Sequence, residues 1–428
     1  MDKIRIFGGN QLNGDIEISG AKNAALPLQC AAILTDQPLV LTRVPDLKDV
    51  LSLDEVLEQL GCSAKYDTKT KKLTLHAPKI TSCEAPYELV RKMRASILVL
   101  GPLVARHGEA KVSLPGGCAI GTRPVDLHIE GLKRLGAEIE LHEGYIHAKA
   151  PKGGLVGAAV HFTKVSVGAT ENLMMAAALA KGTTVLTNAA REPEIVDLGE
   201  CLIAMGAEIE GLGTDKITIN GKQYLRGTEH SVIADRIEAG TFAAAAAMTG
   251  GKVTLKNCEM KHLQYLLEPM NKAGVEIVAS GKDVTVERKR ARLKGFDIMT
   301  VPYPGFPTDL QAQMMSVLTI AEGAGMVTET IFENRFMHVP ELARMGADIT
   351  VHGSSALVRG VPKLKGAPVM ATDLRASVSL ILAGMAAEGT TTVSRIYHLD
   401  RGYEDLVGKL TRVGAKLERF AEREEAAE

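Results

Sequence analysis

The chain has 428 residues, of which 46% are hydrophobic and 24% are charged, a composition typical of soluble globular proteins. A chain of this length is expected to fold as two or three domains. The 50 basic and 51 acidic side chains leave a formal net charge of -1. No bulk field therefore attracts nucleic acid or an anionic membrane, and neither is an expected partner.

The sequence indicates neither a membrane span nor a leader. No apolar run approaches the ~18 residues that a span needs, and the opening MDKIRIFGGN lacks the charged-then-apolar order of a signal peptide. The six cysteines are far apart and form no C-x-x-C pair, which argues against a disulfide framework and a metal site. We therefore expect a cytoplasmic protein that uses no metal and no cofactor.

A short pattern, the end of a helix followed by glycine and then a strand, recurs six times. The copies read EQLGCSAKY, KRLGAEIEL, IAMGAEIEG, NKAGVEIVA, ARMGADITV and TRVGAKLER, with the glycines Gly61, Gly136, Gly206, Gly274, Gly346 and Gly414. Glycine suits the left-handed backbone position that ends a helix. The spacing predicts six repeats of about 70 residues each.

Each repeat opens with a helix rich in small residues, such as ENLMMAAALA or TFAAAAAMTG. A glycine, a strand such as GTTVLTN, a second helix and two or three further strands follow. Helices that are apolar nearly all round belong in an interior rather than at a surface. The expected fold is therefore a layered α/β architecture with the first helix of each repeat inside.

The sixth repeat is truncated, because AKLERF runs directly into the charged tail AEREEAAE. The opening segment KIRIFGGNQLNGDIEISG is predicted to supply the two missing strands. This predicts one domain of residues 22–233, built from repeats 1 to 3, and a second of residues 1–21 plus 234–428, built from repeats 4 to 6 and closed by the N-terminal strands.

Chemically reactive side chains occupy two matching places in the repeats. The start of the first helix carries Lys22, Asn23, Arg94, Asp309, Asp373 and Arg375, and the loop after the next strand carries Cys118, Arg123, Glu192, Arg335 and Arg401. Helix N-termini carry partial positive charge and free N–H groups, so they favour anions. The pattern predicts an anion-binding site. The alternative is that these side chains only cap helices and solvate loops.

The segment LPGGCAIGTRPVDLH carries the clearest signal for reactivity. Pro115, Gly116 and Gly117 break a strand, which places Cys118 on a loop. Arg123, five residues further on, could stabilise a thiolate. No G-K-[ST] follows, so this is not a Walker loop. From the local sequence alone, a cysteine on such a loop is more often inert than catalytic.

Ten dispersed motifs resemble those of a known family. They are SGAKNAALP, KMRAS, LPGGCAIGTRPVDLH, KVSVGATEN, NAAREPEIVDL, ADRIEAGTF, FPTDLQAQ, TETIFENRFMHVPEL, ATDLRAS and IYHLDRGYE. Together, and in this order, they are similar to the motifs of the UDP-N-acetylglucosamine enolpyruvyl transferases, which are 1-carboxyvinyltransferases. The glycine loop with Cys118 separates that family from the shikimate-pathway enolpyruvyl transferases, which share its fold.

The resemblance implies a fold and an activity. The fold is an inside-out α/β barrel of two domains, each with pseudo-threefold symmetry, in agreement with the six repeats. The activity is transfer of the enolpyruvyl (1-carboxyvinyl) group from phosphoenolpyruvate to the 3'-hydroxyl of UDP-N-acetylglucosamine by addition and elimination, with release of phosphate. This is the first committed step of peptidoglycan synthesis, so two small molecules are the expected partners.

The resemblance also implies roles for individual residues. Lys22, Arg123 and Arg401 are expected to surround phosphoenolpyruvate, and Asn23 to lie between the two substrates. Cys118 is expected to add to phosphoenolpyruvate, to be alkylated by fosfomycin and to supply the proton for C3. The other expected substrate-binding positions are Arg94, Pro124, Val125, Asp126, Leu127, Lys164, Val165, Ser166, Val167, Asp309, Ile331, Arg335, Asp373 and Arg375.

The chemistry of the reaction suits these residue types. A sugar hydroxyl needs a base, for which Asp309 is the candidate. The carboxylate and phosphate of phosphoenolpyruvate require several cations. Asp309 could instead be the cap of the helix that begins in PTDLQAQ.

Three other functions are open to the sequence. The first is enolpyruvyl transfer to shikimate 3-phosphate on the same fold. The second is a non-catalytic paralogue that binds UDP-sugars, although such a protein would have no use for both an acid and a base. The third is a repeat scaffold for protein partners, which buried Ala-rich helices do not suit.

Overall fold

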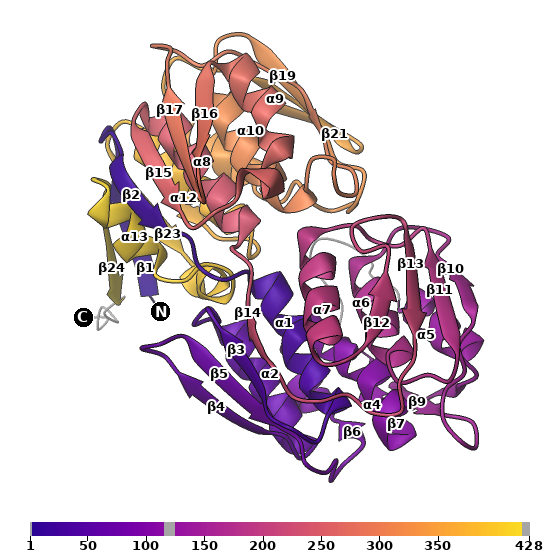
Figure 1. Ribbon diagram of the computed structural model, residues 1–428. Helices are drawn as coiled ribbons and strands as arrows, with labels where there is room; N and C mark the ends of the chain where they lie inside the picture. The colour runs from indigo at the N-terminus through magenta and orange to yellow at the C-terminus, as the bar shows by residue number, and fades with distance from the viewer. Residues whose placement is uncertain (1, 115–124, 422–428) are drawn as a thin grey trace. The chain divides into compact units, whose positions relative to one another are not determined.

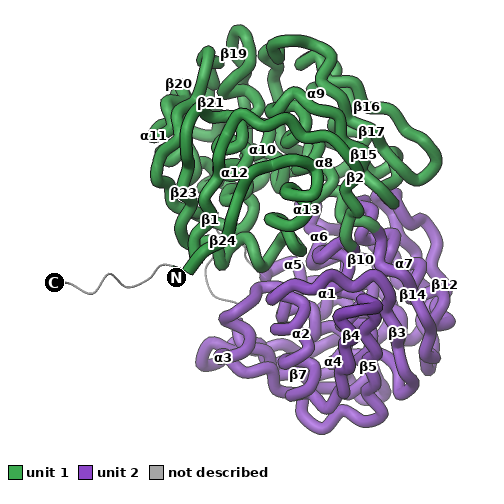
Figure 2. The backbone as a smooth tube through the Cα atoms, turned by 90° about the vertical axis from the view of Figure 1, so that its left-hand side faces the viewer, with its two compact units in different colours: residues 1–19, 118–122, 234–428 green, residues 20–117, 123–233 purple. Residues whose placement is uncertain are grey.

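The computed structural model describes residues 2–114 and 125–421, which form two compact units (Figure 2). Within the described residues, unit 1 comprises 2–19 and 234–421, and unit 2 comprises 20–114 and 125–233. Among the described residues, the chain leaves unit 1 after Ser19 and returns to it after Ile233. These two passages are called the crossings below.

Unit 2 contains three four-stranded sheets that share one pairing pattern. In sheet order their strands are β14 (Glu229–Ser231), β3 (Leu39–Thr42), β5 (Lys72–His76) and β4 (Ser63–Asp67); β6 (Glu84–Ala85), β7 (Glu109–Ser113), β9 (Tyr145–Lys149) and β8 (Glu138–His142); and β10 (Ala159–His161), β11 (Thr183–Thr187), β13 (Lys216–Asn220) and β12 (Glu208–Glu210). In each sheet the first two strands are parallel and the remaining neighbours are antiparallel.

Unit 1 repeats this pattern with three further sheets. Their strands are β2 (Asn13–Glu17), β15 (Lys252–Lys256), β17 (Asp283–Arg288) and β16 (Val275–Ser280); β18 (Ile298–Met299), β19 (Ala324–Thr328), β21 (Ser355–Arg359) and β20 (Asp348–His352); and β22 (Pro368–Met370), β23 (Thr390–Ser394), β1 (Asp2–Phe7) and β24 (Lys416–Ala421). The six-repeat prediction is confirmed, because the same mixed sheet recurs six times in the described residues.

Every sheet takes its parallel edge strand from another repeat. β6 follows the hairpin of the first sheet but pairs with β7 of the second, and β10 likewise moves on to β11. β14, at the end of unit 2, returns to the first sheet, where Glu229 lies opposite Val40. In unit 1, β18, β22 and β2 make the same moves. The three sheets of each unit are therefore linked in a ring.

The N-terminal segment serves two sheets rather than one. β1 fills the gap between β23 and β24, so the sixth sheet gains the strand that its repeat lacks, as predicted. β2 completes the sixth repeat as β6 and β14 complete theirs, because it moves on to pair in parallel with the next sheet of the ring, at β15 of the fourth repeat. The corresponding edge of the sixth sheet is already occupied by β22.

The first helix of each repeat is buried, as predicted. These central helices are α1 (Lys22–Ala31), α4 (Leu100–His107) and α6 (Val167–Ala177) in unit 2, and α8 (Arg236–Thr249), α10 (Gln311–Thr319) and α12 (Ala376–Ala386) in unit 1. In α8 every residue except Thr249 is buried. Figure 1 shows the sheets of each unit outside its central helices, the inside-out arrangement. The alanines allow the helices to pack closely against one another.

The second helix of each repeat is shorter or more amphipathic. These helices are α2 (Lys48–Gln59), α5 (Asp126–Arg134), α7 (Pro193–Ala204), α9 (Gln264–Ala273), α11 (Val339–Arg344) and α13 (Leu406–Arg412). Each is followed by the predicted glycine, and all six glycines have φ between 88° and 109°. The short α3 (Tyr87–Val90) lies outside this scheme. Among the described residues, no helix combines the length and the apolar character that crossing a membrane requires.

Candidate functional site

Lys22 is the first residue of α1, and it is buried. Its Nζ lies 3.0 Å from Oδ2 of Asp49, which is also buried and belongs to the first turn of α2. Asn23 follows and is half-buried. The ion pair fixes the ammonium group at the N-terminal end of a helix, where an anion is favoured. Sequence reasoning missed Asp49, because an acidic residue in a first helical turn is commonplace.

The other predicted residues of unit 2 also lie at helix starts. Arg94 is half-buried and begins the short helix η2 (Arg94–Val99), which leads into α4. Ser166 caps α6, and its Oγ accepts a hydrogen bond of 3.3 Å from the amide of Ala169. In the adjoining stretches, Lys164 and Asp126 are exposed, Val125, Val165 and Val167 are half-buried, and Leu127 is buried.

Cys118, Arg123 and Pro124 lie outside the described residues, so their predicted roles stay predictions. Val125 is the first described residue after them and directly precedes α5. Glu192, from the same set of loop positions, is buried and directly precedes α7.

In unit 2, a buried histidine and a buried asparagine link α5 and α6 to η2 and α4. Nδ1 of His128, on α5, accepts a hydrogen bond of 2.9 Å from Nδ2 of Asn172, on α6. The same amide group also donates to the carbonyl of Ile97 at 3.0 Å, and its Oδ1 accepts from the amide of Gly101 at 2.6 Å. Burial lowers the pKa of His128 to about 4. The imidazole is therefore neutral near pH 7 and serves as an acceptor.

In unit 1, Asp309 is held by two arginines. It lies in the short helix η4 (Thr308–Leu310), and its Oδ1 accepts a 2.7 Å bond from Nη2 of Arg335. Its Oδ2 lies 3.5 Å from Nε of Arg375. Both arginine side chains are 5% exposed, whereas that of Asp309 is 25% exposed. The accessible group of this cluster is thus a carboxylate.

The alternative role of Asp309 as a helix cap is not what the hydrogen bonds show. The N-cap positions of η4 and α10 are Pro307 and Leu310, and neither helix has a side-chain cap. Asp373 lies two residues before Arg375, the N-cap residue of α12, and its Oδ1 accepts from the amides of Arg375 and Ala376 at 2.9 and 3.0 Å. Asp373 thus orders the turn that leads into α12, and its predicted role at the substrate stays a prediction.

Two acidic residues that sequence reasoning missed organise the surroundings of Asp309. The buried Glu329 accepts from Thr308 Oγ1 at 2.8 Å and from the amide of Ile331 at 2.9 Å, which ties the loop of Ile331 to η4. Asp235 Oδ2 lies 3.9 Å from Nη2 of Arg375. Asp235 could have been found from the repeats, because it opens the first helix of the fourth repeat, as Asp309 opens that of the fifth.

Arg401 is half-buried and is the last residue of the short helix η5 (Ile396–Arg401). The structure thus places the predicted residues of unit 1 at the expected positions in their repeats, and it brings Asp309, Arg335 and Arg375 together. Within residues 2–114 and 125–421, no three His, Cys, Asp or Glu side chains are grouped so that they could hold a metal ion. A guanidinium group can bind an anion, and an accessible carboxylate such as that of Asp309 can accept a proton.

Comparisons with known proteins agree with this architecture. A family model described as EPSP synthase (3-phosphoshikimate 1-carboxyvinyltransferase) matches residues 6–410. The UDP-N-acetylglucosamine 1-carboxyvinyltransferase of Rhodospirillum centenum is 60% identical over 99% of this chain and 100% of its own length. The protein of the same name from Acidiphilium cryptum is 60% identical over 98% of this chain and 100% of its own.

Solved structures give the same result for the fold. The enolpyruvyl transferase NikO from Streptomyces tendae has a TM-score of 0.87 at 26% identity and covers 98% of both chains. EPSP synthase from Acinetobacter baumannii has a TM-score of 0.76 at 19% identity, over 98% of this chain and 100% of that chain, and shows the fold alone. By its sequence relatives, its repeats and its fold, the chain belongs to the enolpyruvyl transferase (1-carboxyvinyltransferase) family.

Proposed function

We propose that this chain transfers the enolpyruvyl group of phosphoenolpyruvate to the 3'-hydroxyl of UDP-N-acetylglucosamine and releases phosphate. The observation that carries the proposal is the accessible carboxylate of Asp309, held by Arg335 at 2.7 Å with Arg375 at 3.5 Å. A secondary hydroxyl becomes a nucleophile when a positioned base removes its proton. The names of full-length relatives that are 60% identical support the choice of acceptor.

The reaction proceeds by addition and elimination. The sugar oxygen attacks C2 of phosphoenolpyruvate as Asp309 takes the hydroxyl proton, and C3 gains a proton, which gives a tetrahedral phosphate ketal. Loss of a proton from C3 and departure of phosphate then restore the double bond in the enol ether. We assign the proton at C3 to Cys118, which lies outside the described residues.

Different residues are assigned to the two substrates. Lys22, Arg123 and Arg401 bind the carboxylate and phosphate of phosphoenolpyruvate, since each requires charge-assisted hydrogen bonds. The ion pair with Asp49 at 3.0 Å keeps the Lys22 ammonium at the start of α1. The remaining positions at helix starts, Arg94 and the segments Val125–Leu127 and Lys164–Val167, bind the nucleotide sugar, as does the loop of Ile331. Asn23 contacts both substrates, and Asp373 and Arg375 line the sugar site.

Phosphate release is the decisive assay. Purified protein should release phosphate from phosphoenolpyruvate when UDP-N-acetylglucosamine is present, and not when shikimate 3-phosphate replaces it. Release with shikimate 3-phosphate alone would assign the protein to the other branch of the family. Binding of UDP-N-acetylglucosamine without any release would make it a non-catalytic sugar-nucleotide binder.

Fosfomycin labelling tests the assignment of Cys118 separately. We expect one covalent adduct, mapped by mass spectrometry to Cys118. The other five cysteines serve as internal controls, and four of them, Cys30, Cys62, Cys201 and Cys258, are buried. An adduct on any of the other five, or none at all, would remove Cys118 from the mechanism. We place the reaction in the cytoplasm, as a step of peptidoglycan and cell-wall synthesis.

A further inference from the structure

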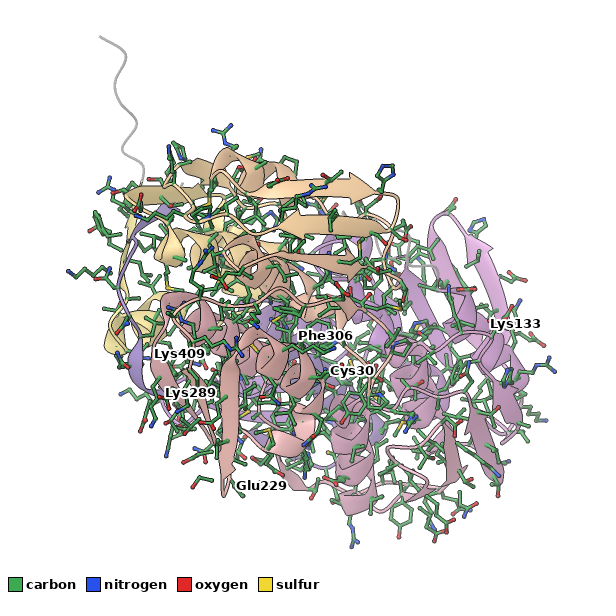
Figure 3. The ribbon with its side chains drawn as sticks, turned by 90° about the horizontal axis from the view of Figure 1, so that it is seen from above. Cys30, Lys133, Glu229, Lys289, Phe306 and Lys409 are labelled. Carbon is green, nitrogen blue, oxygen red and sulfur yellow. The ribbon has the colours of Figure 1, made fainter. Side chains whose placement is uncertain are left out.

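Unit 1 contains a buried ion pair that the proposed chemistry does not use. Nζ of Lys409, on α13, lies 2.7 Å from Oε1 of Glu238, in the first turn of α8 (Lys409 is labelled in Figure 3). The two side chains are 9% and 2% exposed. Burial raises the pKa of Glu238 to about 7, although Lys409 acts in the opposite direction. The pair therefore carries a substantial desolvation cost.

Both partners also bind the last residue of unit 1 before the first crossing. Lys409 Nζ donates to Oγ of Ser19 at 2.6 Å, and the amide of Ser19 donates to Oε2 of Glu238 at 2.7 Å. Oγ of Ser19 in turn donates to Glu404 at 2.7 Å. Ser19 is thus held through its amide and its side chain by the same ion pair. We call Ser19, Glu238 and Lys409 the clamp.

The second crossing is held at the same place. The amide of Asp235, two residues after the chain returns at Ile233, donates to the carbonyl of Ser19 at 2.9 Å. Asp235 Oδ1 then caps α8 by accepting from the amides of Ile237 and Glu238 at 2.8 and 2.9 Å. Both crossings are therefore fastened to the first turn of α8.

The start of α8 is also connected to Asp309, the candidate base, through Arg375. Oδ2 of Asp235 lies 3.9 Å from Nη2 of Arg375, and Nε of Arg375 lies 3.5 Å from Oδ2 of Asp309. A continuous chain of polar contacts thus runs from Lys409 through the start of α8 to Asp309. A shift of α8 by a fraction of an ångström would be transmitted to Arg375, because Arg375 is buried and cannot reorient freely.

A buried ion pair is a poor source of stability, since apolar residues of similar volume often stabilise a fold as well or better. Its directional bonds can instead fix a geometry. We propose that Lys409 and Glu238 are positioning residues, which fasten the two crossings to the first turn of α8 and so hold Asp235 and Arg375 in the arrangement that orients Asp309. The inference rests on the proposed role of Asp309 as the base.

The test compares Lys409→Met and Glu238→Gln with a matched control, Lys272→Met. Lys272 forms an exposed ion pair with Glu268 on α9 of the same unit, at 2.6 Å. We expect each clamp variant to lower kcat for phosphate release by about 10- to 100-fold, the usual effect of misplacing a catalytic group. KM for phosphoenolpyruvate should change by less than about threefold, because the clamp contains none of the cations assigned to that substrate. Lys272→Met should resemble the wild type.

The double variant Lys409→Met/Glu238→Gln separates positioning from simple stability. Removing both charges removes the penalty of an unpaired buried charge, so the stability lost in the single variants should return. The kcat should stay low, because a methionine at position 409 cannot donate to Oγ of Ser19. Recovery of kcat together with stability would overturn the proposal, as would single variants as active as Lys272→Met.

Hydrogen exchange gives a readout that does not depend on activity. In Lys409→Met, peptides that contain the amides of Ser19 and Asp235 should lose protection, while the strands of unit 1 should keep theirs. Uniform loss of protection throughout unit 1 would mean a general structural role and would overturn the proposal. A wild-type protein that releases no phosphate would refute the proposed function instead, and the exchange measurement would still show whether the clamp holds the crossings.

Discussion

Arg335 binds two consecutive residues of η4, through Nη2 to Oδ1 of Asp309 at 2.7 Å and through Nη1 to Oγ1 of Thr308 at 2.8 Å. A planar guanidinium that makes two such bonds has little freedom to rotate. The first carboxylate oxygen is therefore committed to Arg335. The second oxygen, which faces Arg375 at 3.5 Å, is the one that we expect to take the proton of the sugar hydroxyl.

Replacing Asp309 by Asn should lower kcat by roughly 10²–10⁴-fold, the usual range for loss of a general base. The amide has nearly the same shape, and its oxygen can still accept from Arg335, so the fold should be preserved. Phosphate release measures kcat, and thermal unfolding is the control for folding. A loss of less than about tenfold would leave Asp309 with a binding role only.

Replacing Lys22 by Ala should weaken phosphoenolpyruvate binding more than nucleotide-sugar binding. Losing one charge-assisted contact costs about 1.5–3 kcal/mol, which corresponds to ten- to a hundredfold in affinity. Lys22→Arg should restore only part of it, because a planar fork does not replace a compact ammonium. Titration calorimetry with each substrate provides the comparison, and Lys72→Ala, which removes a more exposed cation of unit 2, is the control. Equal losses for both substrates would contradict the assignment.

The buried His128 predicts a loss of stability in mild acid. Its pKa is lowered from 6.5 to about 4 in the fold, so between these values the unfolded chain binds more protons than the folded one. Stability from this group is complete above about pH 6.5 and is lost as the pH falls towards 4. At pH 5 the expected loss is about 2 kcal/mol.

Urea unfolding at pH 7.5 and pH 5 tests this prediction on wild type and His128→Gln. Glutamine can still accept the bond from Asn172 but does not titrate. The wild type should therefore lose about 2 kcal/mol more than the variant between the two pH values. Parallel losses would show that other groups account for the acid sensitivity.

The repeated glycines offer a matched pair in unit 2. Gly61 and Gly206 both have positive φ, 99° and 109°, so alanine is strained at either position. A Cβ at Gly61 would lie 2.5 Å from Thr81 Oγ1 and 2.9 Å from the carbonyl of Lys79, whereas a Cβ at Gly206 would meet only Arg226 Nε, at 4.0 Å. Gly61→Ala should cost about 1–3 kcal/mol more than Gly206→Ala, as overpacking does. Denaturant unfolding of the two variants measures the loss of stability in each. Equal losses would mean that the strained backbone conformation alone accounts for the destabilisation.

Local sequence patterns predicted the repeats well. They could not predict which strands and side chains pair when these lie far apart in the sequence. The glycine anchors and buried helices follow from backbone freedom and from apolar faces, which each segment carries by itself. The destination of β2 depends on an edge that β15 leaves open more than 230 residues away, and nothing in its own sequence records this. For the same reason, the repeats suggested a site at the start of α10 but not the pairing of Asp309 with Arg335.

The ring of exchanged strands sets an order in which the protein can be completed as it leaves the ribosome. Unit 2 has all its described strands once β14 has emerged, at residue 231. At that moment β1 and β2 have already been made, yet β2 must wait for β15, at residues 252–256, and β1 for β23 and β24, which end at residue 421. For most of synthesis the first strand of the chain therefore has an unpaired edge, the kind of surface that recruits wrong partners. Its exposure ends only when β24, the last strand of the described residues, has been made.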